Sequence, residues 1–170
     1  IKPKERLISP SNIREGDAIV FVESSGIHAN GLTMARKIAE KLPKGYVTKL
    51  SDGRSYGETL LDPTHIYVGL VEDCLDCGVD IHYAANITGH GWRKIMRAKT
   101  QEKFSYVVDK PPPCPAVFPF IQMWGNVSNH DMRGTFNCGL GYVLIAPPLA
   151  APGIVEFVNN GGYGFEAFDV

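Results

Sequence analysis

The apolar positions of the chain follow two repeating patterns. Short runs rich in β-branched and aromatic residues, bounded by turn residues, predict strands. These runs cover residues 18–23, 81–87, 104–109, 140–146 and 165–170, with a shorter candidate at 64–68. Between them, apolar residues recur three or four positions apart, which predicts helices at 32–42, 70–75, 115–124 and 152–158.

Strands that alternate with helices predict an α+β fold, here a layered α/β/α domain with a mixed sheet. Residues 43–57 are polar and contain glycine, and residues 110–115 are rich in proline, so both segments are expected to be loops. At 170 residues and 44% hydrophobic content, the chain can bury a real core. We therefore expect a single domain over residues 1–170.

Charge and hydropathy exclude several classes of partner. The net charge is −1, so no basic face for nucleic acid is expected. Neither a secretory signal pattern nor an apolar run long enough to span a membrane is present in the sequence. These features favour a cytoplasmic protein without a nucleic-acid or membrane partner.

The chain has four cysteines, which could form two disulfides, a metal site or four reduced thiols. Cys74 and Cys77 fall on a predicted helical stretch closed by Gly78. No second close pair of cysteines and no histidine pair of metal-ligand spacing accompanies them. We favour reduced thiols that pack like small hydrophobes, and we expect no metal site.

A polar loop between the first predicted strand and the first predicted helix carries the strongest chemical signal. Gly26 and Gly31 allow backbone angles that other residues avoid, and they let a ligand approach closely. The helix that follows directs free N–H groups and its positive dipole end toward the loop. The side chains that could contact a phosphate or carboxylate there are Ser24, Ser25, His28 and Asn30. The alternative is ordinary turn chemistry.

Two residues of this loop have more than one interpretation. His28 could exchange a proton, since the ordinary pKa of histidine is about 6.5, and it could steady a phosphate or a developing charge. It could equally order the loop by hydrogen bonding to the backbone. Asn30 is a preferred residue type for capping a helix, and capping is compatible with ligand contact.

A second candidate anion loop follows the predicted strand 81–87. It consists of Thr88, Gly89, His90 and Gly91. The next residues could form a helix with Arg93, Lys94 and Arg97 in its early turns. Because positive charge at a helix start opposes the dipole, these side chains are better placed facing an anion, although a solvated basic face is the alternative.

A third polar segment, residues 137–141, leads into the predicted strand 140–146. Its glycines are consistent with a turn and the entry into a strand. Asn137 is the candidate ligand-binding residue in this segment.

Four ordered blocks of sequence resemble one enzyme family. They are Gly16-Asp17 with Ser-Ser-Gly-x-His-x-Asn-Gly at 24–31, Gly-Glu-x-Leu-Leu-x-Pro-Thr-x-Ile-Tyr-Val at 57–68, Ala-Asn-Ile-Thr-Gly-His-Gly at 85–91, and Met132 with Thr-Phe-Asn-Cys-Gly-Leu-Gly at 135–141. Together they resemble the carboxyl-terminal domain of the aminoimidazole ribonucleotide synthetase family, also called phosphoribosylformylglycinamidine cyclo-ligases.

The resemblance implies the substrate-side domain of a larger two-domain enzyme of purine biosynthesis. In that family ATP activates the amide oxygen of formylglycinamidine ribonucleotide, and ring closure gives aminoimidazole ribonucleotide. ATP and Mg²⁺ are implied to sit mainly on an amino-terminal domain absent from this chain, with no cofactor bound by this domain alone. The implied partners are a phosphoribosyl substrate, the protein's own amino-terminal domain and, at full length, a second copy. The isolated domain is expected to be inactive.

The resemblance also implies roles for the loop residues. Ser24, Ser25, His28 and Asn30 would hold the substrate or its transferring phosphoryl group, with His28 as the catalytic candidate. The chain starts at Ile1 without a methionine, which is expected of a piece of a longer protein.

The chain departs from the family pattern at four positions. His90 replaces a glycine, Asn86 a histidine, Gly69 a lysine and Gly134 an arginine, for which the adjacent Arg133 could compensate. The departures leave two alternatives open. One is a non-catalytic relative that acts as a ligand-binding or interaction module, and the other is an ATP-dependent phosphoryl-transfer relative with another substrate.

Overall fold

The computed structural model describes residues 7–98 and 104–170, so the predicted single domain 1–170 includes short segments outside the described residues. Its sheet has four strands in the order β2-β3-β1-β4. The strands are β1 (Ala18–Glu23), β2 (Tyr83–Asn86), β3 (Leu140–Ala146) and β4 (Ala167–Asp169). The α+β class is confirmed, but all three strand pairs are antiparallel, so the expected mixed sheet is wrong. The spacing of hydrophobic residues could not have shown the strand directions, because successive side chains point to opposite faces in parallel and antiparallel strands alike.

The predicted helices are all present, with shifts of a few residues at their ends. The α-helices are α1 (Leu32–Lys41), α2 (Tyr56–Leu60), α3 (Val68–Asp76), α4 (Val117–Gly125), α5 (Asn129–Thr135) and α6 (Ala151–Asn160). Short 3-10 helices are η2 (Pro10–Asn12), η3 (Gly45–Val47) and η4 (Gly91–Arg97). The predicted loop at 43–57 therefore contains η3 and the start of α2, and the basic segment after the second loop forms η4.

Two predicted strands are wrong. Residues 104–109 form no strand, although Phe104, Tyr106 and Val108 all pack against the sheet while the residues between them are exposed. The side chains alternate as in a strand, but the backbone makes no ladder. The short candidate at 64–68 is also not a strand, because Val68 begins α3.

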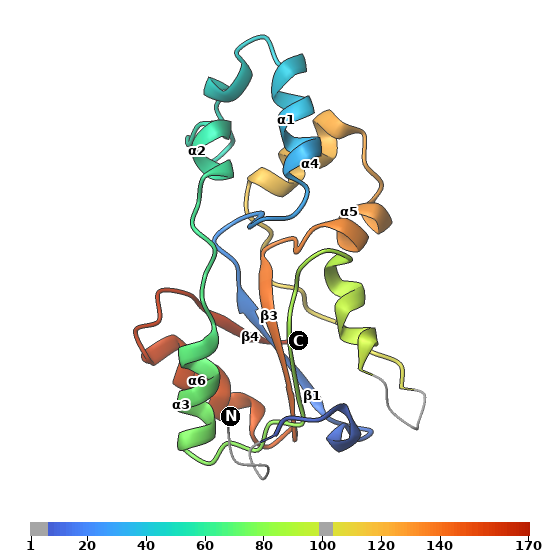
Figure 1. Ribbon diagram of the computed structural model, residues 1–170, viewed down its shortest axis with the longest axis vertical. Coiled ribbons are helices and arrows are strands. Elements are labelled where there is room, and N and C mark those ends of the chain that lie inside the picture. The colour runs from blue at the N-terminus through green and yellow to red at the C-terminus, as the bar shows by residue number, and fades with distance from the viewer. Residues whose placement is uncertain (1–6, 99–103) are drawn as a thin grey trace.

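Figure 1 shows that α1, α2, α4 and α5 gather at one end of the molecule, whereas the sheet forms the other half with α3 and α6 beside it. On one face, Val20 and Leu144 pack with Leu70 of α3 and Ile154 of α6. The opposite face is covered by η4 and irregular chain in place of the expected second helical layer.

The helical end has a hydrophobic cluster of its own, formed mainly by residues of α1 and α4, with one buried residue each from α2 and α5. Strand β1 ends where this cluster begins, so the loop between β1 and α1 lies at the junction of the two halves (Figure 1). In the described part of the chain, no helix is both long and apolar enough to cross a lipid bilayer.

Candidate functional site

The loop of residues 24–31 connects β1 to α1 and ends in a glycine that the fold requires. Gly31 is the N-cap residue of α1, with φ of 75°, and no side chain caps the helix. The expected capping role of Asn30 is therefore wrong. A Cβ atom on Gly31 would lie 2.0 Å from the ring of Phe136, so both the backbone angle and the packing demand glycine. Within residues 7–98 and 104–170, no side chain accepts a hydrogen bond from the first-turn N–H groups of α1, and anion binding by these groups stays a prediction.

Asn137 clamps this loop to the turn before β3. Its side chain is fully buried and donates from Nδ2 to the Gly26 carbonyl at 2.9 Å. Its Oδ1 accepts from the Gly139 N–H at 2.9 Å and from the Ser24 hydroxyl at 3.1 Å. Ser24 is itself buried, and its N–H donates to the Gly139 carbonyl at 2.8 Å. The polar atoms of Ser24 and Asn137 thus bond within the protein, and ligand contact by them stays a prediction.

The second loop, residues 88–91, lies against the first. A Cβ atom on Gly89 would be 3.6 Å from the Asn30 Oδ1. Gly91 has φ of 52°, and a Cβ atom there would lie 2.1 Å from the Arg133 carbonyl, so glycine is again required. Trp92 Nε1 donates to the Asn137 carbonyl at 2.8 Å. The three segments singled out from the sequence therefore meet at one place.

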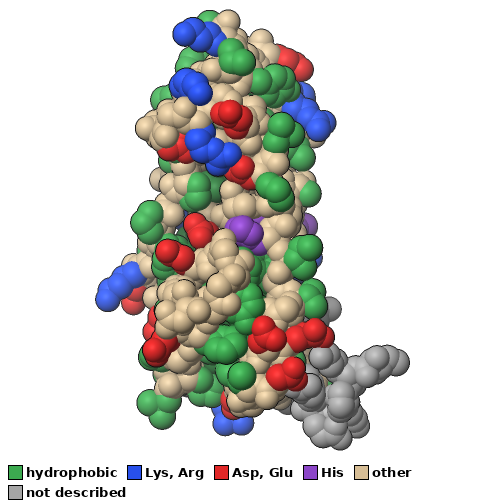
Figure 2. Space-filling view, turned by 90° about the vertical axis from the view of Figure 1, so that its left-hand side faces the viewer, with side chains coloured by type: hydrophobic (Ala, Val, Ile, Leu, Met, Phe, Trp, Pro, Cys, Tyr) green, Lys and Arg blue, Asp and Glu red, His purple; other side chains and the backbone are tan. Residues whose placement is uncertain are grey.

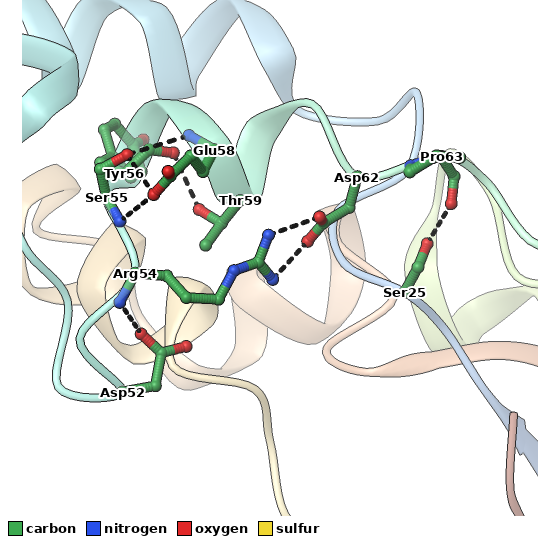
Figure 3. A network of polar contacts seen from close by, with 9 residues as sticks. All are labelled: Ser25, Asp52, Arg54, Ser55, Tyr56, Glu58, Thr59, Asp62 and Pro63. Atoms are coloured by element: carbon green, nitrogen blue, oxygen red, sulfur yellow. Dashed lines mark hydrogen bonds and ion pairs between the residues drawn. The ribbon is translucent and has the colours of Figure 1, made fainter. Parts of the chain in front are cut away.

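The connection between α2 and α3 forms a further wall of the loop. The Ser25 hydroxyl donates to the Pro63 carbonyl, and a Cβ atom on Gly26 would lie 3.5 Å from the Asp62 carboxylate. In Figure 3, Asp62 lies between the Ser25–Pro63 hydrogen bond and the guanidinium of Arg54. This guanidinium binds both Asp62 carboxylate oxygens, at 2.9 and 2.6 Å. This bidentate pair holds the connection in place beside the loop.

His28 lies among aromatic side chains that the sequence analysis did not select. Its ring centroid is 6.2 Å from that of His65 and 6.5 Å from that of Tyr67, whose hydroxyl donates to the Glu23 carbonyl at 2.6 Å. Among the described residues, the buried Nε2 of His28 has no hydrogen-bond partner. His65 occupies an unassigned position of the block 57–68, so only the folded chain shows that it faces His28.

Burial, and then the neighbouring His65, lower the pKa of His28 to about 4. The side chain is therefore almost entirely neutral at neutral pH, where about a quarter of histidines with the ordinary pKa of 6.5 would carry a proton. It can accept a proton or a hydrogen bond, but it does not supply a standing positive charge. On the face drawn in Figure 2, histidine side chains reach the surface at mid-height, with charged side chains of both signs around them.

Arg93 takes up the space beside Gly134. A Cβ atom on Gly134 would lie 3.1 Å from the Arg93 guanidinium carbon, so this guanidinium stands next to the position where the family pattern has an arginine. The Arg93 Nη2 atom is also 2.8 Å from His130 Nε2. Position 134 thus has a guanidinium nearby, but it comes from η4.

A second guanidinium lies close to the first. Arg133 stacks over the ring of Trp92 at 5.2 Å. Both arginines line a cavity of about 500 Å³ together with His130 and apolar side chains. Arg93 thus faces a cavity, and anion binding there stays a prediction.

His90 lies at the surface, and its predicted contact with a ligand stays a prediction. The side chain is exposed, its φ is 81°, and its Nδ1 lies 3.0 Å from Arg97 Nη2. It therefore lies on the outer side of the second loop and is directed toward the end of η4.

The described residues contain no group of three or more His, Cys, Asp or Glu side chains that could hold a metal ion. All four cysteines are free, as favoured from the sequence. Cys74 is buried, which raises the pKa of its thiol to about 11, whereas Cys77 and Cys114 are exposed.

Comparison with known proteins shows the family of this chain. The family described as AIR synthase related protein, C-terminal domain, matches residues 14–163, and the chain belongs to this family. It is 39% identical over 166 residues to the phosphoribosylformylglycinamidine cyclo-ligase of Methanococcus vannielii, covering 97% of this chain and 46% of the relative. It is 38% identical over 158 residues to the same-named protein of Methanococcus maripaludis, covering 92% of this chain and 44% of the relative. The chain thus spans about half the length of the curated relatives it matches.

Proposed function

We propose that this chain is the substrate-side half of an ATP-dependent cyclo-ligase that converts formylglycinamidine ribonucleotide to aminoimidazole ribonucleotide in the cytoplasm. Both relatives are named phosphoribosylformylglycinamidine cyclo-ligase, which supports the reaction. The observation that carries the proposal is the meeting of residues 24–31, 88–91 and 137–139. The buried amide of Asn137 joins the first and third of these segments, and Gly89 of the second lies beside Asn30.

The reaction requires little side-chain chemistry beyond positioning and charge stabilisation. In our proposal the free N–H groups of α1 and the side chain of Asn30 hold an anionic group of the phosphoribosyl substrate. Arg93 and Arg133 offset negative charge on the neighbouring side. Neutral His28 accepts a hydrogen bond or a proton from the reacting amidine. Ser24 and Asn137 position the loop and need not touch the substrate.

ATP and Mg²⁺ belong to the proposal at the level of the full-length protein. The relatives are about twice as long as this chain, and we propose that their additional half supplies most of the ATP and Mg²⁺ contacts. The same half and, at full length, a second copy of the protein are the proposed partners.

The direct test is a ring-closure assay with formylglycinamidine ribonucleotide, ATP and Mg²⁺ on the protein at its natural length. We expect the imidazole product and ADP in equal amounts, and neither from the 170-residue chain alone. Turnover by the 170-residue chain alone would overturn the two-half arrangement. If the protein at natural length binds the substrate but forms no product, a ligand-binding relative would be favoured instead. The departures from the family pattern, among them His90, left that alternative open.

The proposed anion site has a test of its own. Titration of the 170-residue chain with inorganic phosphate should shift the amide signals of residues 26–34 in NMR spectra, since these N–H groups surround the start of α1. Arg93→Met should weaken the response, whereas Arg36→Met, on the exposed side of α1, should not. Shifts confined to another surface would remove this site from the proposal.

A further inference from the structure

Cys114 and Cys138 are held side by side although 24 positions separate them. The Cys114 thiol donates to the Cys138 carbonyl at 3.3 Å. The segments next to the two cysteines also pack closely. Even a Cβ atom added to Gly139 would come within 2.6 Å of the Pro115 ring. The proline-rich segment around Cys114 restricts its own backbone, which keeps the two cysteines together.

The pair is accessible to a small molecule. Both cysteines line a cavity of about 160 Å³, together with Trp92 and Arg133. Cys114 is exposed and Cys138 is half-buried. The other two thiols differ, since Cys74 is buried in the core and Cys77 is exposed on the far end of α3.

We propose that Cys114 and Cys138 form a reversible intramolecular disulfide by exchange with a low-molecular-weight disulfide such as oxidised glutathione. The Cys138 thiolate attacks one glutathione sulfur, the glutathione S–S bond breaks, and one glutathione leaves and takes up a proton. The Cys114 thiol then loses its proton and attacks the Cys138 sulfur, which releases the second glutathione. Two electrons pass from the two protein thiols to the small disulfide, which becomes two molecules of reduced glutathione.

The order of the two steps follows from the surroundings of each thiol. The neighbouring Cys114 side chain and, to a lesser degree, the Arg133 guanidinium lower the pKa of Cys138. The interaction with the Cys138 side chain, together with burial, raises the pKa of Cys114. Because the thiolate is the attacking species, and because the Arg133 guanidinium lines the same cavity and favours a thiolate on Cys138, Cys138 should react first and Cys114 should resolve the mixed disulfide.

The cross-link would tie residues 113–115 to the turn that contains Asn137. Asn137 in turn holds the Gly26 carbonyl and the Ser24 hydroxyl of the first loop. The redox state of the pair would therefore bear on the mobility of the candidate site. The proposal itself does not depend on the proposed enzymatic reaction.

The test treats the folded 170-residue chain with oxidised glutathione near neutral pH, alkylates the remaining thiols, and maps the peptides by mass spectrometry. We expect one cross-link, between Cys114 and Cys138. Cys114→Ser should stop at a glutathione adduct on Cys138. In Cys138→Ser, Cys114 should react roughly tenfold more slowly than Cys138 does in the unaltered chain. Cys77→Ser is the matched control and should leave the cross-link unchanged.

Several results would overturn the proposal. One is the absence of the cross-link in a chain whose amide NMR spectrum shows it to be folded. Another is faster modification of Cys77 than of Cys138, and a third is an unchanged pattern in concentrated urea, where fold-imposed pairing is lost. Reduced dithiothreitol should restore both thiols, and failure to do so would exclude a reversible disulfide. Because Cys114 is exposed, Cys114→Ser tests the first step even if Cys138→Ser does not fold.

Discussion

Replacing Asn137 with alanine tests whether the clamp between the first loop and the turn before β3 stabilises this fold. The side chain is fully buried and takes part in three hydrogen bonds, to the Gly26 carbonyl, the Gly139 N–H and the Ser24 hydroxyl. All three are lost in Asn137→Ala. The change therefore removes partners from two segments that are distant in sequence.

The expected loss can be estimated bond by bond. The Gly139 N–H loses the Asn137 acceptor, and an unsatisfied buried donor costs about 1–3 kcal/mol. The Ser24 hydroxyl has one proton, which lies within reach of both Asn137 Oδ1 and the Gly26 carbonyl at 3.0 Å, so without Asn137 it donates to Gly26 and adds no further cost. Because the Gly26 carbonyl keeps this donor, the lost Nδ2 contact costs only about 1 kcal/mol. We expect the free energy of unfolding to fall by about 2–4 kcal/mol in total.

Urea unfolding followed by circular dichroism measures this difference at constant m-value. Asn129→Ala is the control, because Asn129 is exposed and accepts one hydrogen bond, from Gln122 at 2.6 Å. Its loss should stay within about 0.5 kcal/mol. A loss below about 1 kcal/mol for Asn137→Ala would refute the view that this amide holds the two segments together.

Three further predictions concern the same region. Gly31→Ala should lower the free energy of unfolding by about 2–4 kcal/mol in the urea assay, because its Cβ would meet the Phe136 ring in a left-handed backbone; a loss under about 1 kcal/mol would contradict the packing. His90→Gly should raise the free energy of unfolding by about 0.5–1 kcal/mol, since φ of 81° favours glycine; a lower melting temperature would be the contrary result. His28 should titrate near pH 4 in NMR spectra. Because the unfolded chain binds that proton already below pH about 6.5, the contribution of neutral His28 to stability should be complete above that pH and decline toward pH 4. His28→Gln should remove this part of the pH dependence, and an unchanged slope would contradict the lowered pKa.

The sequence by itself determined the local elements of this protein. Strands 18–23 and 140–146 and the helix that begins at Leu32 follow from where apolar side chains recur, because each element must turn one face or stripe toward the core. The four ordered blocks were likewise sufficient to indicate the family to which the chain belongs. Both inferences rest on information that is present within a short stretch of chain.

Only the tertiary structure decided which of these elements pair and which polar atoms remain free. Phe104, Tyr106 and Val108 alternate like a strand, yet their backbone has no neighbouring strand in register. Asn137 was a candidate ligand residue from its position in a polar segment, but the fold directs its amide to Gly26. The spacing of hydrophobic residues indicates which way each side chain faces. The hydrogen-bond partner of the Asn137 amide, by contrast, lies more than a hundred positions away in the sequence. That is why the loops could be named from the sequence, but their meeting point could not.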